Sequence, residues 1–165
     1  MKVNVTIVGN HDTKAYNGQE QSITRFTVTN IEYTINGQVV DGSGFSPDDV
    51  KLKEGVLSVA KGTDVDKYYM GLTANSFTTT NTSIQEVTFI VTDGYIEITP
   101  KAVVVKITGN HDVKAYDGQE HEVTGYTIDA EGIISINDIN YNGEAKAART
   151  DVGITNMNLK AGDFS

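Results

Sequence analysis

The chain has 165 residues, 38% of them hydrophobic and 21% charged, and its formal net charge at pH 7 is −9. Both halves are acidic and cysteine is absent, which excludes disulfides, thiolate metal sites and cysteine nucleophiles. Acidic halves lack the clustered basic residues that nucleic acid or an anionic membrane surface requires, and no apolar run approaches the roughly 20 residues of a membrane helix. We therefore expect no nucleic-acid partner and no membrane insertion of this segment.

Taken in chain order, the sequence reads almost entirely as strand. Apolar and polar residues alternate over residues 2–7, with the period of two that is typical of a half-buried strand. Asn17-Gly18 and Asn36-Gly37 are pairs that tolerate positive φ, so each predicts a tight hairpin turn. Further extended pieces lie beside these turns, at residues 14–16, 23–28 and 31–35.

The middle of the first hundred residues changes character. Residues 41–49 (DGSGFSPDD) are too polar for a strand and predict a surface loop, with a single helical turn opening at Pro47. Asp93-Gly94 predicts another two-residue hairpin, which returns the chain into residues 95–98. The expected strands of this region cover residues 52–59, residues 68–72 and the apolar alternation of Val87, Phe89 and Val91, with a Thr-rich loop or edge over residues 76–83.

Regularly spaced short strands with glycine turns favour an all-β fold. Their number per hundred residues is typical of an immunoglobulin-like antiparallel β-sandwich, and no window longer than about ten residues has helical periodicity. We expect the interior of the sandwich to be filled by apolar and aromatic side chains at alternate positions: Val5, Ile7, Tyr16, Ile23, Val87 and Phe89.

One stretch of the sequence is written twice. Residues 5–28 and residues 105–128 are identical at fourteen of twenty-four aligned positions, among them GNHD, KAY and GQE. Such a duplication indicates one supersecondary unit used twice. We therefore predict a first immunoglobulin-like repeat over residues 1–100 and a second over residues 101–165. Because the Thr99-Pro100-Lys101 link is short, we expect a stiff tandem pair.

The second copy is shorter than the first. Residues 150–164 stay in step with residues 63–77, but nothing corresponds to residues 78–99. The second repeat is therefore expected to lack about two C-terminal strands and to leave an unpaired edge. Three explanations remain open: the chain is a fragment of a longer array, residues 84–164 form a permuted complete set, or molecules exchange strands.

Several runs of the second copy carry a family resemblance. Gly109-Asn110, the run KAYDGQE at 114–120 and VTGY at 123–126, followed by a Thr-Asp-Val-Gly run into Met-x-Leu, resemble the YDG/MBG-type β-rich repeats of large bacterial surface proteins. The first copy departs from this pattern at Asn17 and Arg25, where the motif has Asp and Gly. The resemblance covers essentially the whole chain. It implies a tandem array, an extracellular or cell-surface location, and a role in a stalk or adhesin.

Few residues suggest chemistry. His11-Asp12 and His111-Asp112 supply too few ligands for zinc, and they predict turns in which Asp bonds to its own backbone. A better metal candidate is calcium, because three oxygen donors share one glycine-containing loop that the second copy lacks: Asp41, Asp48 and Asp49. A further hypothesis is a covalent Lys to Asn bond at Lys14 or Lys114. We expect no cofactor and no catalytic residue, hence no enzyme.

Two classes of function fit this reading. The repeats are either stiff, non-catalytic spacers whose partners are neighbouring repeats, or modules whose loops bind a glycan or a host protein. The recurrent Tyr16 and Tyr116 are expected to pack inward rather than to stack on sugars. If binding occurs, the expected contacts are aromatic residues of the variable segments: Phe45, Tyr68 and Tyr69.

Overall fold

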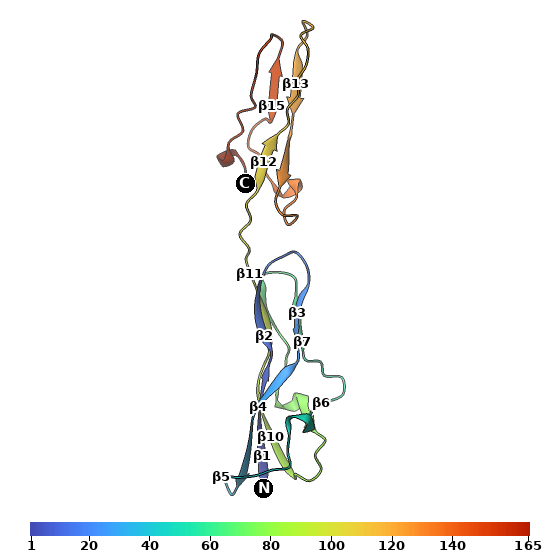
Figure 1. The fold of residues 1–165 in the computed structure, drawn as a ribbon, viewed down its shortest axis with the longest axis vertical. Helices are drawn as coiled ribbons and strands as arrows, with labels where there is room; N and C mark the ends of the chain where they lie inside the picture. The colour runs from blue at the N-terminus through green and yellow to red at the C-terminus, as the bar shows by residue number, and fades with distance from the viewer. The chain divides into compact units, whose positions relative to one another are not determined.

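The computed structural model describes residues 1–165 and shows a protein built of strands, which confirms the expectation that the fold is all-β (Figure 1). Fifteen short strands are joined by turns and by four 3₁₀ helices of three residues each. The chain divides into two compact units, residues 1–101 and residues 102–165. None of its helices has the length and apolar character needed to cross a membrane.

The first unit contains a four-stranded sheet in the order β10-β1-β4-β5. The central strand β1 runs parallel to β10 and antiparallel to β4, with a bulge between Thr6 and Ile7. Because side chains alternate along β1, Val3, Val5 and Ile7 share one face and are completely buried. The strands of this sheet are β1 (Lys2–Gly9), β4 (Phe26–Ile35), β5 (Gln38–Val40) and β10 (Glu86–Thr92).

A second sheet of the first unit has the order β2-β11-β8. Its central strand β11 is parallel to β2 and antiparallel to β8, and it also contacts the strand pair β3-β7. Ile96, Ile98 and Ala60 are each at most 1% exposed, so this part of the unit has its own buried core. The strands are β2 (His11–Ala15), β3 (Gln21–Thr24), β7 (Val59–Gly62), β8 (Asp66–Tyr69) and β11 (Tyr95–Thr99).

A third strand pair, β6-β9, closes the core of the first sheet. The ring of Phe77 on β9 is buried and meets the ring of Phe26 edge-on at 4.9 Å between centroids, with Phe89 at 5.8 Å. Short 3₁₀ turns precede both strands. The elements are η1 (Pro47–Asp49), β6 (Val50–Leu52), η2 (Ala74–Ser76) and β9 (Phe77–Thr79).

The hairpin expectations divide into one success and two failures. Asn36 and Gly37 both have positive φ and join β4 to β5 as a two-residue hairpin, as predicted. At Asn17-Gly18 and Asp93-Gly94 the expected hairpins are wrong, because each turn carries the chain from one sheet to another. The two parallel pairs β1-β10 and β2-β11 also correct the expectation that all pairing is antiparallel.

Glycines explain how the paired strands leave one sheet for the other. A Cβ atom on Gly9 would lie 2.2 Å from the backbone nitrogen of Gly94, so the two backbones touch where β1 ends and β11 is about to begin. Only glycine permits such an approach. The backbone N–H of Tyr95 then donates to the carbonyl oxygen of Asn10 at 3.1 Å, and the two strands continue as the pair β2-β11.

The predicted core was partly right. Val5 and Ile7 are fully buried, but the other four side chains of the predicted set are only partly buried. The strand expected over residues 52–59 is interrupted, since β6 ends at Leu52 and β7 begins at Val59. The partly buried members of the predicted core are Tyr16, Ile23, Val87 and Phe89.

The second unit has two strand pairs, β12-β14 and β13-β15. Its buried apolar residue is Ala130, and beside the strands the rings of Tyr126, Tyr141 and Phe164 pack together with centroids 4.6 to 5.9 Å apart. The elements are β12 (Lys106–Gly109), β13 (His121–Thr124), β14 (Tyr126–Asp129), η3 (Ile136–Asp138), β15 (Lys146–Arg149) and η4 (Ala161–Asp163).

Candidate functional site

The Phe45 side chain is not exposed to solvent, as the side chain of a binding residue would be. It is only 8% exposed and belongs to the main core cluster. Its backbone N–H donates to the hydroxyl of Tyr33 at 3.0 Å, and that hydroxyl donates back to the Phe45 carbonyl oxygen at 3.3 Å. Because Gly42 has no side chain, the loop also lies directly against the Tyr33 ring. The loop is thus folded over the core, and Phe45 is a packing residue.

Tyr68 also has a structural role. Its ring covers the backbone of Gly62, where a Cβ atom would lie 2.1 Å from the ring, and its hydroxyl donates to the Asp64 carbonyl oxygen at 3.3 Å. Tyr68 lies on β8 beside the buried Ile96 of β11. The side chain therefore closes one end of the second core and is not available as a flat contact surface.

The three calcium candidates are not gathered into a metal site. The Asp49 carboxylate accepts hydrogen bonds from the Ser46 backbone at 2.8 Å and from the Asn81 amide at 3.2 Å. These bonds, the Ser46 one first, lower the pKa of Asp49. Asp41 and Asp48 do not join it, because no three His, Cys, Asp or Glu side chains of the chain are placed to hold a metal ion. Asp49 instead shapes the η1 turn, as the third residue of a capping box.

That turn has a counterpart in the second unit, which corrects the expectation that the whole loop is lost there. Asp138 accepts hydrogen bonds from both the backbone N–H and the hydroxyl of Ser135, each at 2.8 Å. The pKa of Asp138 is lowered by the same bonds, the backbone one first. A Ser-x-x-Asp spacing occurs in both units, at Ser46–Asp49 and at Ser135–Asp138. This spacing is the sequence signal from which the turn could have been predicted.

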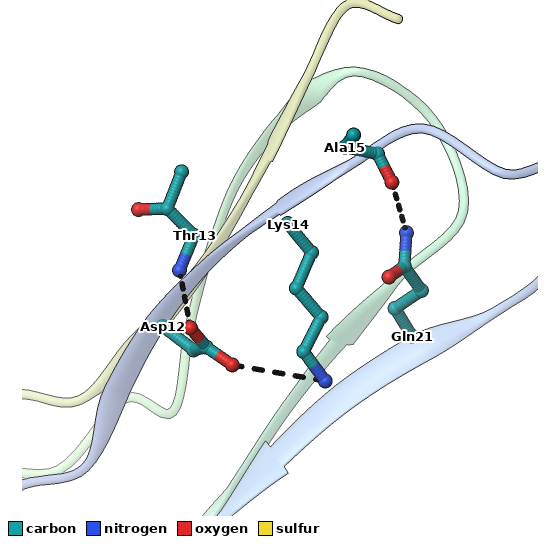
Figure 2. Close-up of polar contacts among 5 residues, drawn as sticks. All are labelled: Asp12, Thr13, Lys14, Ala15 and Gln21. Carbon is teal, nitrogen blue, oxygen red and sulfur yellow. Dashed lines mark hydrogen bonds and ion pairs between the residues drawn. The ribbon is translucent and has the colours of Figure 1, made fainter.

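The recurrent Asp and Lys residues contact groups of their own local segment. Figure 2 shows Asp12 accepting the Thr13 backbone N–H at 2.8 Å, with the Lys14 ammonium 3.8 Å from the other carboxylate oxygen. In the second unit the corresponding ion pair of Asp112 and Lys114 is 3.0 Å long, and Lys114 is the largest cause of a lowered Asp112 pKa. The contact of both lysines is thus a neighbouring aspartate rather than the asparagine that a covalent bond would need.

Tyr69 is the predicted contact residue that does face solvent. It is 60% exposed and lies on β8 directly opposite Tyr95 of β11, which in turn lies opposite His11 of β2. The His11 and Tyr95 rings stack with centroids 5.3 Å apart, and the Tyr69 ring lies 6.0 Å from Tyr95. These three rings form one row across the three-stranded sheet, which we call the aromatic row.

Basic and acidic groups border the aromatic row. The Lys67 ammonium lies 3.9 Å from the centre of the Tyr95 ring, within the range of a cation–π contact, and 4.0 Å from the Glu97 carboxylate. On the other side of β2, the Gln21 amide donates to the Ala15 carbonyl oxygen at 3.0 Å and ties β3 to β2 (Figure 2). The row therefore crosses three paired strands, and the Tyr69 ring is tilted by 59° against the Tyr95 ring.

No family model matches the chain, and neither a curated protein nor a solved structure matches it. His11 and Tyr69 are the exposed members of the aromatic row, whereas Tyr95 between them is partly buried. Exposed aromatic rings stack on apolar or carbohydrate surfaces and attract cations. The row supplies no enclosed pocket. Alternation of Tyr95 and Glu97 with the apolar Ile96 and Ile98 is the sequence signal that placed one member of the row on an outer face. The parallel pairing that adds His11 has no such signal.

Proposed function

We propose that this chain is a non-catalytic structural segment, made of two units of one immunoglobulin-like β repeat of the YDG/MBG type, and that it serves as a spacer in a stalk or adhesin on a bacterial cell surface. The observation that carries the proposal is a shared hydrogen bond. The Asn10 side-chain amide donates to the Thr24 carbonyl oxygen at 3.0 Å, and the Asn110 amide donates to the Thr124 carbonyl oxygen at 2.8 Å.

Other polar groups of the duplicated motif also form hydrogen bonds with nearby backbone groups. Asn17 accepts the Gln19 N–H and Asp117 accepts the Gln119 N–H, both at 2.9 Å. The backbone N–H of Asn10 bonds to the carbonyl oxygen of residue 25, and that of Asn110 bonds to residue 125. A motif used in this way holds turns in shape, which is what a structural repeat requires of it.

The pairing within the first unit suits a segment under tension. β1 and β10 are parallel over seven residue pairs, and β2 and β11 are parallel over five. Tension between the start of β1 and the end of β11 would slide these strands past one another, so many ladder hydrogen bonds must break together. Peeling the same strands apart would break the bonds one at a time. This difference supports a load-bearing spacer.

Single-molecule force spectroscopy tests this function, and the absence of cysteine allows handles at chosen positions. Handles on an added N-terminal cysteine and on Thr99→Cys load the first unit in the sliding geometry. Handles on Lys2→Cys and Glu86→Cys pull apart two residues that face each other at one end of the β1-β10 pair. We expect a much higher unfolding force in the first geometry. Equal forces in both geometries would argue against a load-bearing role.

The aromatic row favours a second candidate function, binding of a glycan or a host protein. The exposed Tyr69 ring lies beside the His11–Tyr95 stack on a neighbouring strand, so the contact surface is a sheet face rather than a loop. A glycan array probed with the whole chain and with Tyr69→Ala tests this candidate. Binding that is lost in the variant while the fold is retained would favour recognition over spacing, whereas a spacer gives no saturable signal.

A further inference from the structure

A groove of about 380 Å³ lies within the second unit. Its floor includes Val123 of β13 and Ala147 of β15, and its two sides are residues 112–116 and residues 151–155. The second side is held by the Arg149 guanidinium, which donates to the carbonyl oxygens of Asp151 at 2.8 Å and Val152 at 3.2 Å. No strand pairing joins the two sides across the groove.

In the first unit the corresponding place is filled by a strand. Residues 111–115 correspond to β2 and residues 153–156 correspond to β8, and in the first unit β11 lies between β2 and β8 and pairs with both. The supporting pair is the same in both units: Gln21 pairs with Gly62 on β3-β7, and His121 pairs with Arg149 on β13-β15. The groove is therefore the position of β11 with no strand in it.

The sides of the groove carry unused backbone groups. In the first unit the Tyr16 N–H donates to Thr99 at 2.8 Å and the Met70 N–H donates to Gly94 at 2.9 Å. In the second unit the hydrogen bond and ion pair of residues 111–116 lie within that segment, and neither 111–115 nor 153–156 forms a strand. Both segments therefore have backbone groups that can form ladder hydrogen bonds with an added strand.

The floor of the groove is incompletely buried for the same reason. Ala60 of the first unit is 1% exposed beneath Ile96 and Ile98, whereas the corresponding Ala147 is only partly buried. Two branched side chains at alternate positions of an incoming strand would restore that cover, as they do in β11.

We propose that this groove binds an extended polypeptide strand, supplied from outside residues 102–165, that lies parallel to residues 111–115 and antiparallel to residues 153–156. The strand inserts two branched apolar side chains, at the positions of Ile96 and Ile98, over Val123 and Ala147. This is β-strand addition, in which main-chain hydrogen bonds give affinity and alternate side chains give specificity. The inference rests on the repeat relationship that also supports the proposed function.

The outer face of the groove sets a further requirement on the strand. In β11, Glu97 lies between Thr13 and Lys67, which suit a carboxylate. The corresponding residues of the second unit are Val113 and Ile154, which are 91% and 86% exposed. A branched apolar residue between them would pair with both, and a carboxylate would not. The preferred strand therefore has three consecutive apolar residues where β11 has Ile-Glu-Ile.

A second copy of this chain is a poor source of the strand. Its β11 carries Ile96 and Ile98, which are at most 1% exposed in their own unit. Donating β11 to a neighbour would expose the core of the donor unit while covering the groove of the acceptor. The exchange therefore gives no net gain in buried apolar surface. The occupant is instead a separate segment with the β11 pattern.

Titration of the whole chain with synthetic peptides tests the proposal. The probes are the sequence of residues 93–100, the same peptide with Glu97→Val, and a control with Ile96→Asp and Ile98→Asp. We expect one site per chain, several-fold tighter binding of the Glu97→Val peptide, no binding of the control, and new amide protection over residues 111–115 and 153–156. Equal binding of all three peptides, or binding of none, would overturn the proposal.

Fusion provides a second measurement that does not depend on peptide solubility. Ser165 corresponds to Thr78, so residues 79–99 are appended directly after Ser165, with and without Asp at the positions of Ile96 and Ile98. The intact extension should slow amide exchange of the second unit and leave the first unit unchanged, and the Asp version should do neither. If the chain without extension is a dimer that already protects residues 111–115, a second copy fills the groove and the proposal is wrong.

Failure here is distinguishable from failure of the proposed function. The force comparison loads β1, β2, β10 and β11 of the first unit only, and its outcome does not depend on whether the groove of the second unit is filled.

Discussion

β1 and the segment 102–109, which ends in β12, carry nearly the same sequence pattern but differ in how much of it is buried. Val3, Val5 and Ile7 are completely buried, whereas Val103, Val105 and Ile107 are only partly buried. β1 has a neighbour on both sides, and β12 pairs with β14 alone. Alternation therefore determines which face a side chain lies on, while the neighbouring strands determine whether that face is covered.

The largest expected effect tests this difference with one substitution made twice. Ile7→Ala should cost the first unit about 2 to 5 kcal/mol, because it leaves a cavity beneath a fully covered strand. Ile107→Ala should cost the second unit less than half of that, since its side chain is already partly in water. Amide hydrogen exchange, followed separately for residues 1–101 and 102–165, gives the two free energies of opening.

The control for this comparison is the Ile107→Ala substitution made in an extended chain. In the chain extended by residues 79–99, Ile107→Ala should become more costly, because the added strands cover β12. An unchanged cost there, or equal costs of the two substitutions in the original chain, would show that burial of β1 does not depend on β10.

Sequence reasoning recovered the local features of this fold better than its connections. The Asn36-Gly37 hairpin and the strand around Val87, Phe89 and Val91 follow from turn chemistry and alternation alone. Parallel pairing of β1 with β10 does not, because the partner lies some eighty residues away and leaves the alternation of either strand unchanged. For the same reason, the sequence does not predict that the chain passes from one sheet to another at the turns containing Gly18 and Gly94.

The candidate site shows the same division. Tyr69 was expected to be an exposed contact and faces solvent, but the sequence could not show that Tyr95 and His11 lie in line with it across two strand pairings. Phe45 was misread because a polar loop need not be an open one. A single hydrogen-bonded pair, Tyr33 with the Phe45 backbone, folds that loop onto the core.

A smaller effect is expected at the one motif position where the two units differ in backbone preference. Arg25 has φ of 75° and Gly125 has φ of 85°, a conformation that disfavours residues with a Cβ atom. Arg25→Gly should therefore stabilise the first unit by up to about 1 kcal/mol, and Gly125→Arg should destabilise the second by about 1 kcal/mol or more.

The second change of that pair carries an extra cost. A Cβ atom at position 125 would lie 3.1 Å from the Asn110 amide nitrogen, which bonds to Thr124. Urea unfolding, followed by amide signals of each unit, measures both changes. A first unit that is weakened by Arg25→Gly would mean that the Arg25 side chain contributes more than its backbone conformation costs.

The smallest expected effect depends on pH and arises at the turn where the first unit has Asn17 and the second has Asp117. The Gln119 backbone N–H, and then the His121 side chain at 2.8 Å, lower the pKa of Asp117. A carboxylate with a lowered pKa stabilises the folded state above its unfolded pKa, which is about 3.9, and this contribution is lost as the pH falls through its folded pKa.

Asp117→Asn makes the second unit resemble the first at this turn, since Asn17 accepts the corresponding Gln19 N–H at the same 2.9 Å. The variant should be less stable than the parent at neutral pH, and the difference should shrink as the pH falls below about 4. Urea midpoints of the second unit, measured at several pH values, give this difference. If the difference in urea midpoint between the parent and Asp117→Asn stays constant over these pH values, the turn needs only a hydrogen-bond acceptor. The negative charge that distinguishes the second unit from the first would then add no stability.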